Sequence, residues 1–177
     1  MRREFLIFGR PRSRTAWMAN FLTSQGSHCF HEGLANSRMN YGALSMQMHS
    51  VPRVHTVGNA DTGMIHHVHD ALEAFPDARL VMMTENEYSW RMFVEKHSIA
   101  KWFVDKVDQD YSYAKEVLAD HDTLFLPCDD VTRSAFWANR AWRHCLGLGP
   151  PFSMERYKLL QGLNVQVIPE HLADRIK

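Results

Sequence analysis

The beginning of the chain joins a short apolar run to an arginine-rich loop and a helical pattern. The apolar run is Phe5–Phe8, the loop is Gly9–Arg14, and helical apolar spacing follows from Thr15 to Thr23. A glycine at the end of a strand lets the backbone turn tightly, and the N–H groups that open the next helix attract an anion. The arginines of the loop indicate that this anion is strongly charged. The segment therefore predicts a strand, an anion-binding loop and a helix.

Short apolar runs and longer amphipathic stretches alternate along the rest of the chain, which is typical of β-α-β units around a parallel sheet. The predicted strands are Phe5–Phe8, His28–Phe30, His55–Val57, Leu80–Met83 and Thr123–Leu126. The predicted helices are Thr15–Thr23, Gly63–Phe75, Tyr88–Val104 and Ser134–Leu146. We therefore expect an α/β fold with three layers, a central parallel sheet flanked by helices. The 177 residues, 45% of them hydrophobic, suffice for one core, so residues 1–177 are expected to form a single domain.

Charge and cysteine usage exclude several classes of protein. The 20 basic and 20 acidic side chains cancel, so neither nucleic acid nor a membrane surface is an expected partner. No segment approaches the roughly 20 apolar residues that span a bilayer, so we expect a soluble, cytoplasmic protein. The three cysteines, Cys29, Cys128 and Cys145, form no C-x-x-C pair and are expected to be small buried side chains.

The arginine-rich loop departs from the Walker A pattern G-x-x-x-x-G-K-[ST]. Gly9 matches the first glycine, whereas Arg14, Thr15 and Ala16 stand at the second glycine, the lysine and the hydroxyl residue. That hydroxyl normally ligates magnesium. Its absence makes a magnesium-dependent kinase or triphosphatase a poor fit, while a group transfer that relies on arginine and N–H donors remains open.

The pattern G-x-P-R-S-x-T-x-W from Gly9 to Trp17 resembles the 5′-phosphosulfate loop of the sulfotransferases that use 3′-phosphoadenosine 5′-phosphosulfate (PAPS). That family normally has glycine at the position of Arg14. The resemblance implies a P-loop NTPase-like fold, with Arg12 contacting the phosphosulfate, hydroxyls donating to its oxygens and Trp17 stacking on adenine. The loop residues implied to bind PAPS are Gly9, Arg10, Pro11, Arg12, Ser13, Arg14, Thr15 and Trp17. An ordinary strand-to-helix turn with solvated arginines is the alternative.

A carboxylate follows the second predicted strand, in Cys29-Phe30-His31-Glu32-Gly33. Ligands of an open α/β sheet bind beyond the carboxyl ends of its strands. If the second strand neighbours the loop strand, as expected, this carboxylate lies beside the crevice of the loop. The resemblance implies a general base here, glutamate in some sulfotransferases and histidine in others. Because adjacent side chains point in different directions, only Glu32 or His31 faces the loop, and we favour Glu32. A solvated glutamate after a strand is the alternative.

The segment after the strand near Arg79–Met83 bears on the 3′-phosphate of the donor. Many sulfotransferases hold that phosphate with an arginine and a serine, but the corresponding positions here are Thr84 and Met92. Ser89 and Arg91 lie close by and are the predicted substitutes. A solvated helix start explains them equally well.

Two further segments have a simpler interpretation. His66, His67, His69 and Asp70 are close in sequence, but on a helix only His66 and Asp70 share a face, so the group offers at most two or three ligands and no metal site is expected. Gly58–Gly63 is expected to be a turn with a helix cap at Asp61 or Thr62, and a contribution to the acceptor pocket is the alternative. After the break at Gly147–Pro151, residues 151–177 are expected to form a C-terminal lid over the site or a surface helix.

The sequence thus predicts a PAPS-dependent sulfotransferase that moves a sulfuryl group to the hydroxyl of a small molecule or an exposed hydroxyl group. Glu32 is the predicted base, and Arg12 stabilises the leaving 3′,5′-phosphoadenosine without a metal. One alternative is a phosphotransferase that uses ATP and magnesium. Another is a non-catalytic nucleotide- or anion-binding module of the same fold, which Thr84 and Met92 favour. A second subunit that completes the site is compatible with either enzyme.

Overall fold

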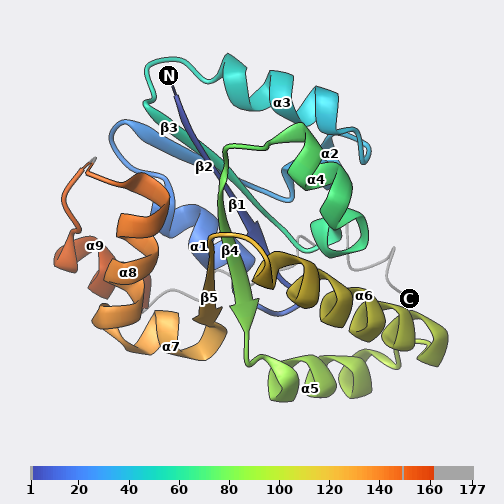
Figure 1. Ribbon diagram of the computed structural model, residues 1–177. Helices are drawn as coiled ribbons and strands as arrows, with labels where there is room; N and C mark the ends of the chain where they lie inside the picture. The colour runs from blue at the N-terminus through green and yellow to red at the C-terminus, as the bar shows by residue number, and fades with distance from the viewer. Residues whose placement is uncertain (1, 149, 162–177) are drawn as a thin grey trace.

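The computed structural model describes residues 2–148 and 150–161, which form a five-stranded, all-parallel sheet with helices on both faces (Figure 1). The strand order is β2-β3-β1-β4-β5. The strands are β1 Arg3–Phe8, β2 Ser27–His31, β3 Thr56–Asp61, β4 Arg79–Thr84 and β5 Thr123–Pro127. All five predicted strands are present, so the predicted α/β class with a parallel sheet is confirmed.

The helices cover the two faces of the sheet in separate groups. The helices are α1 Thr15–Leu22, α2 Gly33–Asn36, α3 Tyr41–Ser50, α4 Val68–Ala74, α5 Glu87–His97, α6 Lys101–Ala119, α7 Cys128–Arg133, α8 Ala135–Leu146 and α9 Met154–Gln161, with a 3₁₀ helix η1 at Gly63–His67. Helices α1, α7, α8 and α9 pack on one face, and α3, α4, α5, α6 and η1 pack on the other (Figure 1).

Strand β1 is the centre of both cores. Phe5 and Ile7 point into the core beneath α1 and α8, whereas Leu6 and Phe8 point into the core beneath α4 and α6. All four side chains are fully buried. A parallel strand covered on both faces reads as a continuous apolar run, which is why this strand was predictable.

Strand β3 is longer than the sequence predicts. Gly58–Asp61 was expected to be a turn, but it continues the strand and pairs with β1. The reason is steric, because a Cβ at Gly58 would lie 2.2 Å from a ring carbon of Phe5. Only glycine lets that ring pack against the neighbouring strand. Gly58 therefore marks a close approach between two strands, and the prediction of a turn is wrong.

The predicted helix Tyr88–Val104 is two helices. Ser98 adopts a left-handed φ of 50° and ends α5, and its N–H bonds to the carbonyls of the last turn. After a short link, α6 begins at Lys101 and continues to Ala119, a span that the sequence pattern missed. The free cysteines Cys29, Cys128 and Cys145 are buried, as predicted.

Helix α9 belongs to the predicted C-terminal segment and packs along α1. The indole Nε1 of Trp17 donates to the carbonyl of Leu160 at 3.2 Å, and the guanidinium of Arg156 donates to the carbonyl of Phe21 at 3.3 Å. Tyr157 is buried in the same core. The rest of the predicted lid, residues 162–177, lies outside the described residues. Of the helices in the described ranges, none is both long and apolar enough to cross a membrane.

Candidate functional site

The arginine-rich loop lies at the carboxyl end of the central strand. Strand β1 pairs with β3 on one side and β4 on the other, and the connection from β3 to β4 crosses β1. This is the position where strand order reverses, and ligands of open α/β sheets bind at such switch points. The loop is therefore in the place where a ligand site is expected.

The backbone of the loop has two left-handed residues. The φ angles of Arg12 and Arg14 are 71° and 65°, and Arg14 is the residue that precedes α1. Arginine in this conformation costs roughly 1–2 kcal/mol, so the surrounding structure must hold the loop in place. A Cβ at Gly9 would lie 2.2 Å from Oγ of Ser13. The loop therefore folds directly back onto the end of β1, which requires glycine at position 9.

Arg10 is an anchor of the loop. Only 5% of it is exposed, and its Nε donates to Oδ1 of Asn86 at 2.7 Å while Nη1 donates to Oδ1 of Asp108 at 2.9 Å. Nη2 pairs with the carboxylate of Glu87, and the guanidinium lies 4.5 Å from the ring centroid of Tyr111. The protein itself neutralises this cation. The predicted contact between Arg10 and PAPS does not fit this placement.

Arg12 and Arg14 are arranged differently from Arg10. Both are partly exposed, and Cζ of Arg12 lies 5.5 Å from the ring centroid of Phe93 on α5. Burial, and next the charge of Arg14, lower the pKa of the Arg12 guanidinium. Within the described residues, the single ion pair of either side chain joins Nη2 of Arg14 to Oδ1 of Asp129 at 3.7 Å. The structure therefore brings together two cations that repel each other and have little compensating negative charge.

The remaining loop residues lie deeper. Ser13 is fully buried, and its Oγ has no hydrogen-bond partner among the described residues. Thr15 is buried at the first position of α1. Trp17 is 2% exposed and stacks on Phe21 with ring centroids 4.7 Å apart. Its indole belongs to the core, so the predicted stacking of Trp17 on adenine does not fit this placement.

Glu32 follows β2, which is not a neighbour of β1. Strand β3 lies between them, so the expectation that the strand bearing Glu32 adjoins the loop strand is wrong. Glu32 has a left-handed φ of 54°, and its carboxylate Oε1 lies 3.8 Å from Nε2 of His31. Its side chain is 39% exposed. The sequence correctly placed the carboxylate at the carboxyl edge of the sheet but not its separation from the loop.

Asp61 was interpreted from the sequence only as part of the expected turn Gly58–Gly63. It ends β3, pairs in register with Phe8 just before the loop, and is 1% exposed. Its Oδ1 accepts from the N–H of Gly63 at 2.7 Å, and its Oδ2 accepts from the N–H of Leu34 at 2.9 Å. Both oxygens are therefore occupied by backbone donors. Interpreting Gly58–Asp61 as a buried strand would have revealed this residue.

The histidines after β3 are paired separately. Nδ1 of His66 bonds to the carboxylate of Asp110 on α6, and Nε2 of His69 bonds to the hydroxyl of Tyr113 at 2.8 Å. In the part of the chain that the structure describes, no three His, Cys, Asp or Glu side chains are grouped to hold a metal ion. The histidines instead connect η1 and α4 to α6.

The predicted 3′-phosphate residues lie on α5, next to the loop. Nε of Arg91 donates to Oε1 of Glu87 at 2.8 Å, and its Nη2 lies 3.3 Å from Oδ2 of Asp108. Arg10 and Arg91 thus share two carboxylates in a cluster of balanced charge. Ser89 is partly buried on the same helix. The structure brings Arg91 to the loop anchor, where acidic side chains already pair with two of its three guanidinium nitrogens, Nε and Nη2.

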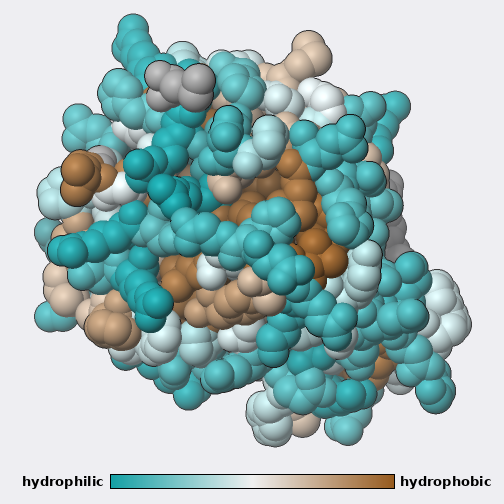
Figure 2. Space-filling model, in the orientation of Figure 1, coloured by the Kyte–Doolittle hydropathy of each residue, from teal (hydrophilic) through white to brown (hydrophobic). Residues whose placement is uncertain are grey.

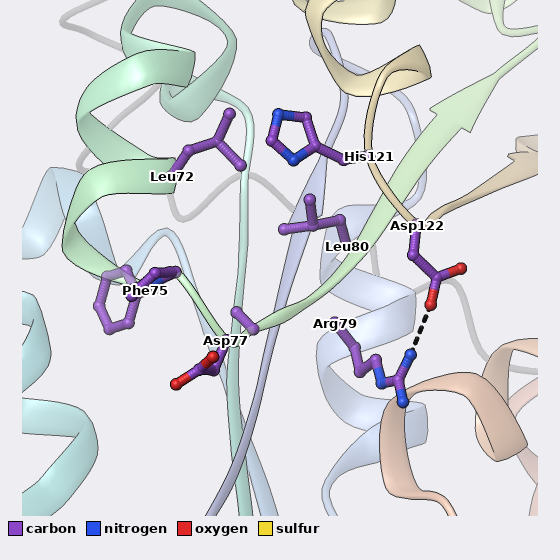
Figure 3. A pocket seen from close by; sticks show the side chains of 9 residues that line it. Leu72, Phe75, Asp77, Arg79, Leu80, His121 and Asp122 are labelled. Atoms are coloured by element: carbon purple, nitrogen blue, oxygen red, sulfur yellow. Dashed lines mark hydrogen bonds and ion pairs between the residues drawn. The ribbon is translucent and has the colours of Figure 1, made fainter.

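Two hollows lie at the opposite edge of the sheet, where the strands begin. One has a volume of about 340 Å³ and includes Leu72, Leu80 and His121, with Arg79 paired to Asp122 at its rim (Figure 3). Figure 2 shows an apolar area there, between α4 and the start of β4. The other, of about 520 Å³, is lined by Arg2, Arg3, Glu4, His49, Asp77 and Arg79. Because β1 begins at Arg3 and ends at the loop, neither hollow is part of the loop site.

No family model matches the chain, and no curated protein shows significant similarity to it. Function must therefore be argued from the loop, the turn at Glu32 and their surroundings.

Proposed function

We propose that the protein is a PAPS-dependent sulfotransferase with a P-loop NTPase-like fold, in which Arg12 and Arg14 hold the phosphosulfate. The observation that carries the proposal is that both arginines are partly exposed in the loop at the switch point of the sheet, where, among the described residues, Arg14 makes one ion pair and Arg12 makes none. They lie close enough for Arg14 to lower the pKa of Arg12. An anion between them would relieve that repulsion, and a phosphosulfate offers negative charge on both of its halves.

Two further observations support an anion at the loop. The N–H groups at the start of α1 follow a left-handed residue, a geometry that often forms an anion-binding concavity. The buried Oγ of Ser13 has no hydrogen-bond partner among the described residues, so it is a candidate donor to an anion at the loop. Ser89 and Arg91 are the proposed contacts of the 3′-phosphate, because α5 adjoins Arg12 through Phe93.

In the proposed reaction, the acceptor oxygen forms a bond to sulfur while Glu32 takes the proton of the acceptor hydroxyl. The bond between sulfur and the bridging phosphate oxygen breaks, and its electron pair leaves with 3′,5′-phosphoadenosine. Arg12 neutralises the charge that develops on this oxygen, a contribution of roughly 3 kcal/mol for one well-placed donor. A carboxylate base contributes on the order of 10²- to 10⁴-fold. The acceptor is a small molecule or an exposed hydroxyl group.

A non-catalytic anion-binding module is the second candidate. The observation that favours it is the position of Glu32 on β2, with the whole of β3 between it and the loop strand. A magnesium-dependent phosphotransferase is less well supported. Ala16 supplies no hydroxyl ligand, and both oxygens of Asp61 already accept backbone N–H groups.

The proposal is tested by thermal unfolding with 3′,5′-phosphoadenosine, and with ATP in the presence and absence of magnesium. A ligand that binds only the folded state raises the Tm. We expect 3′,5′-phosphoadenosine to raise it without metal and by more than ATP does. Stabilisation by magnesium-ATP alone would instead support the phosphotransferase. If neither nucleotide raises the Tm, the result would support the non-catalytic module, with an anion other than these nucleotides as its ligand.

A further inference from the structure

We propose that Asn59 and Asp61, two buried side chains at the end of β3, are positioning residues for the carboxylate of Glu32. The inference rests on the proposed function, in which Glu32 is the general base. Asn59 is fully buried and Asp61 is 1% exposed. The oxygens of both side chains accept backbone N–H groups, so each acts through the turn that carries Glu32.

The two side chains hold that turn by its backbone. Oδ1 of Asn59 accepts from the N–H of Gly33 at 2.9 Å, and Oδ2 of Asp61 accepts from the N–H of Leu34 at 2.9 Å. These are the first two N–H groups after Glu32, and the first groups of a short helix have no partner within the helix itself. Hydrogen bonds to a carboxylate are about twice as strong as neutral ones, so Asp61 fixes the turn firmly.

The conformation of the turn requires such support. Glu32 has a left-handed φ of 54°, which is unfavourable for glutamate. Its N–H donates to the carbonyl of Ala60 at 3.0 Å, so the backbone of β3 also holds Glu32 in place. A Cβ at Gly33 would lie 2.6 Å from Oδ1 of Asn59. Glycine at position 33 therefore permits the close approach on which the hydrogen bond depends.

The same strand end also meets the loop. Asp61 pairs in register with Phe8, the residue before Gly9, and Ala60 pairs with both Ile7 of β1 and His31 of β2. The end of β3 therefore sets the spacing between the anion loop and Glu32. A base must be held within about 0.5 Å of its productive position, which a rigid strand achieves better than a solvated loop.

The test compares Asp61→Asn with the wild-type protein in three measurements. The amide keeps the shape of the carboxylate but replaces one acceptor oxygen with NH₂. We expect hydrogen exchange at the amide of Leu34, in the turn that carries Glu32, to accelerate by about tenfold or more. The affinity for 3′,5′-phosphoadenosine should change by less than about twofold, because the loop keeps its own anchors. Release of sulfate from PAPS, with water as acceptor, should slow by at least about tenfold.

A double variant decides whether Asp61 acts through Glu32. If it does, Asp61→Asn combined with Glu32→Gln should release sulfate no more slowly than Glu32→Gln alone. The control is Asp70→Asn, an exposed carboxylate on α4, which should leave all three measurements unchanged. Asn59→Ala removes the acceptor of Gly33, together with a donor to Sδ of Met64, and provides the same test if Asp61→Asn does not fold.

The outcomes separate this inference from the proposed function. Unchanged exchange at the turn, or a loss of turnover that adds to that of Glu32→Gln, would overturn the positioning role while sulfate release by the wild type still supports a sulfotransferase. A wild-type protein that neither binds 3′,5′-phosphoadenosine nor releases sulfate would overturn the proposed function. The positioning role would then fall as well, because it has no base to serve.

Discussion

The loop after β1 and the turn after β2 occupy equivalent places in the fold but use their polar groups in opposite ways. The loop is anchored by a side-chain donor, Arg10, whose partners are the amide oxygen of Asn86 and the carboxylates of Glu87 and Asp108. The turn is anchored by side-chain acceptors, Asn59 and Asp61, which use up its backbone N–H groups. Both segments contain left-handed residues that only such anchoring sustains.

The difference indicates the part that each segment takes in the proposed chemistry. The loop satisfies its anchor and leaves Arg12 and Arg14 with little negative charge around them, so it is suited to an anion. In the turn, the backbone N–H groups of Gly33 and Leu34 are bonded to β3, while the carboxylate of Glu32 is exposed. The turn is therefore suited to accept a proton. In the proposed reaction, equivalent positions at the carboxyl edge of one sheet are thus divided between holding an anion and accepting a proton.

The largest expected effect concerns the anchor of the loop. Arg10→Met should lower the free energy of unfolding by about 2–3 kcal/mol, because it leaves Glu87 and Asp108 without their buried partner. Urea unfolding measures this loss. The matched control is Arg91→Met, which removes a cation that pairs with the same two carboxylates from the solvent side and should cost less. Equal losses from the two variants would show that Arg10 is not the anchor.

The next largest effect concerns Arg12, which belongs to the part of the loop that is proposed to bind the ligand. Arg12→Ala should weaken the binding of 3′,5′-phosphoadenosine by roughly 10- to 100-fold, as expected for the loss of a charge-assisted contact. The stability of the unliganded protein should change little, because the substitution also relieves repulsion from Arg14. Titration calorimetry and urea unfolding distinguish the two quantities. Arg143→Ala, an exposed cation on α8, is the control. Unaltered affinity in the Arg12 variant would contradict the assignment of the loop.

The sequence predicted the strands better than the site because the two depend on different ranges of interaction. A strand such as Phe5–Phe8 is buried on both faces, so its own composition shows it. The roles of Arg10 and Arg12 cannot be read in this way, since the partners of Arg10 include Asp108, which is 98 residues away. Trp17 likewise has the same local pattern whether it meets adenine or, as here, the core beneath α9.

The order of the strands was also beyond the sequence pattern. Adjacent positions in the chain suggested that β2 lies beside β1, but Gly58 allows β3 to pack against Phe5 and take that place. The separation of Glu32 from the loop follows from this single insertion. Parallel pairing is set by packing on both faces of the sheet, and local propensity does not determine it.

The smallest expected effect is the response of the loop anchor to acid. Burial alone raises the pKa of the Glu87 carboxyl, but hydrogen bonds from Arg10 and Arg91, and then their charges, outweigh burial and hold that pKa below its ordinary value of 4.5. The unfolded chain therefore binds more protons than the folded one as the pH falls through this range. The contribution of Glu87 to stability is complete above about pH 4.5 and is lost as the pH falls through the lower pKa of the folded state.

Glu87→Gln should remove this part of the acid dependence and flatten the plot of unfolding midpoint against pH below 4.5. The effect is small because Glu87 is largely exposed and the pairs are screened by solvent. Glu73→Gln, at an exposed position on α4, is the control and should leave the slope unchanged. If Glu87→Gln has the same slope as the wild type, the carboxylate is not coupled to Arg10. In that case Asn86 and Asp108 alone hold Arg10, and protonation of Glu87 does not weaken the loop anchor. The loop would then resemble the turn at Glu32, whose anchors Asn59 and Asp61 do not include Glu87.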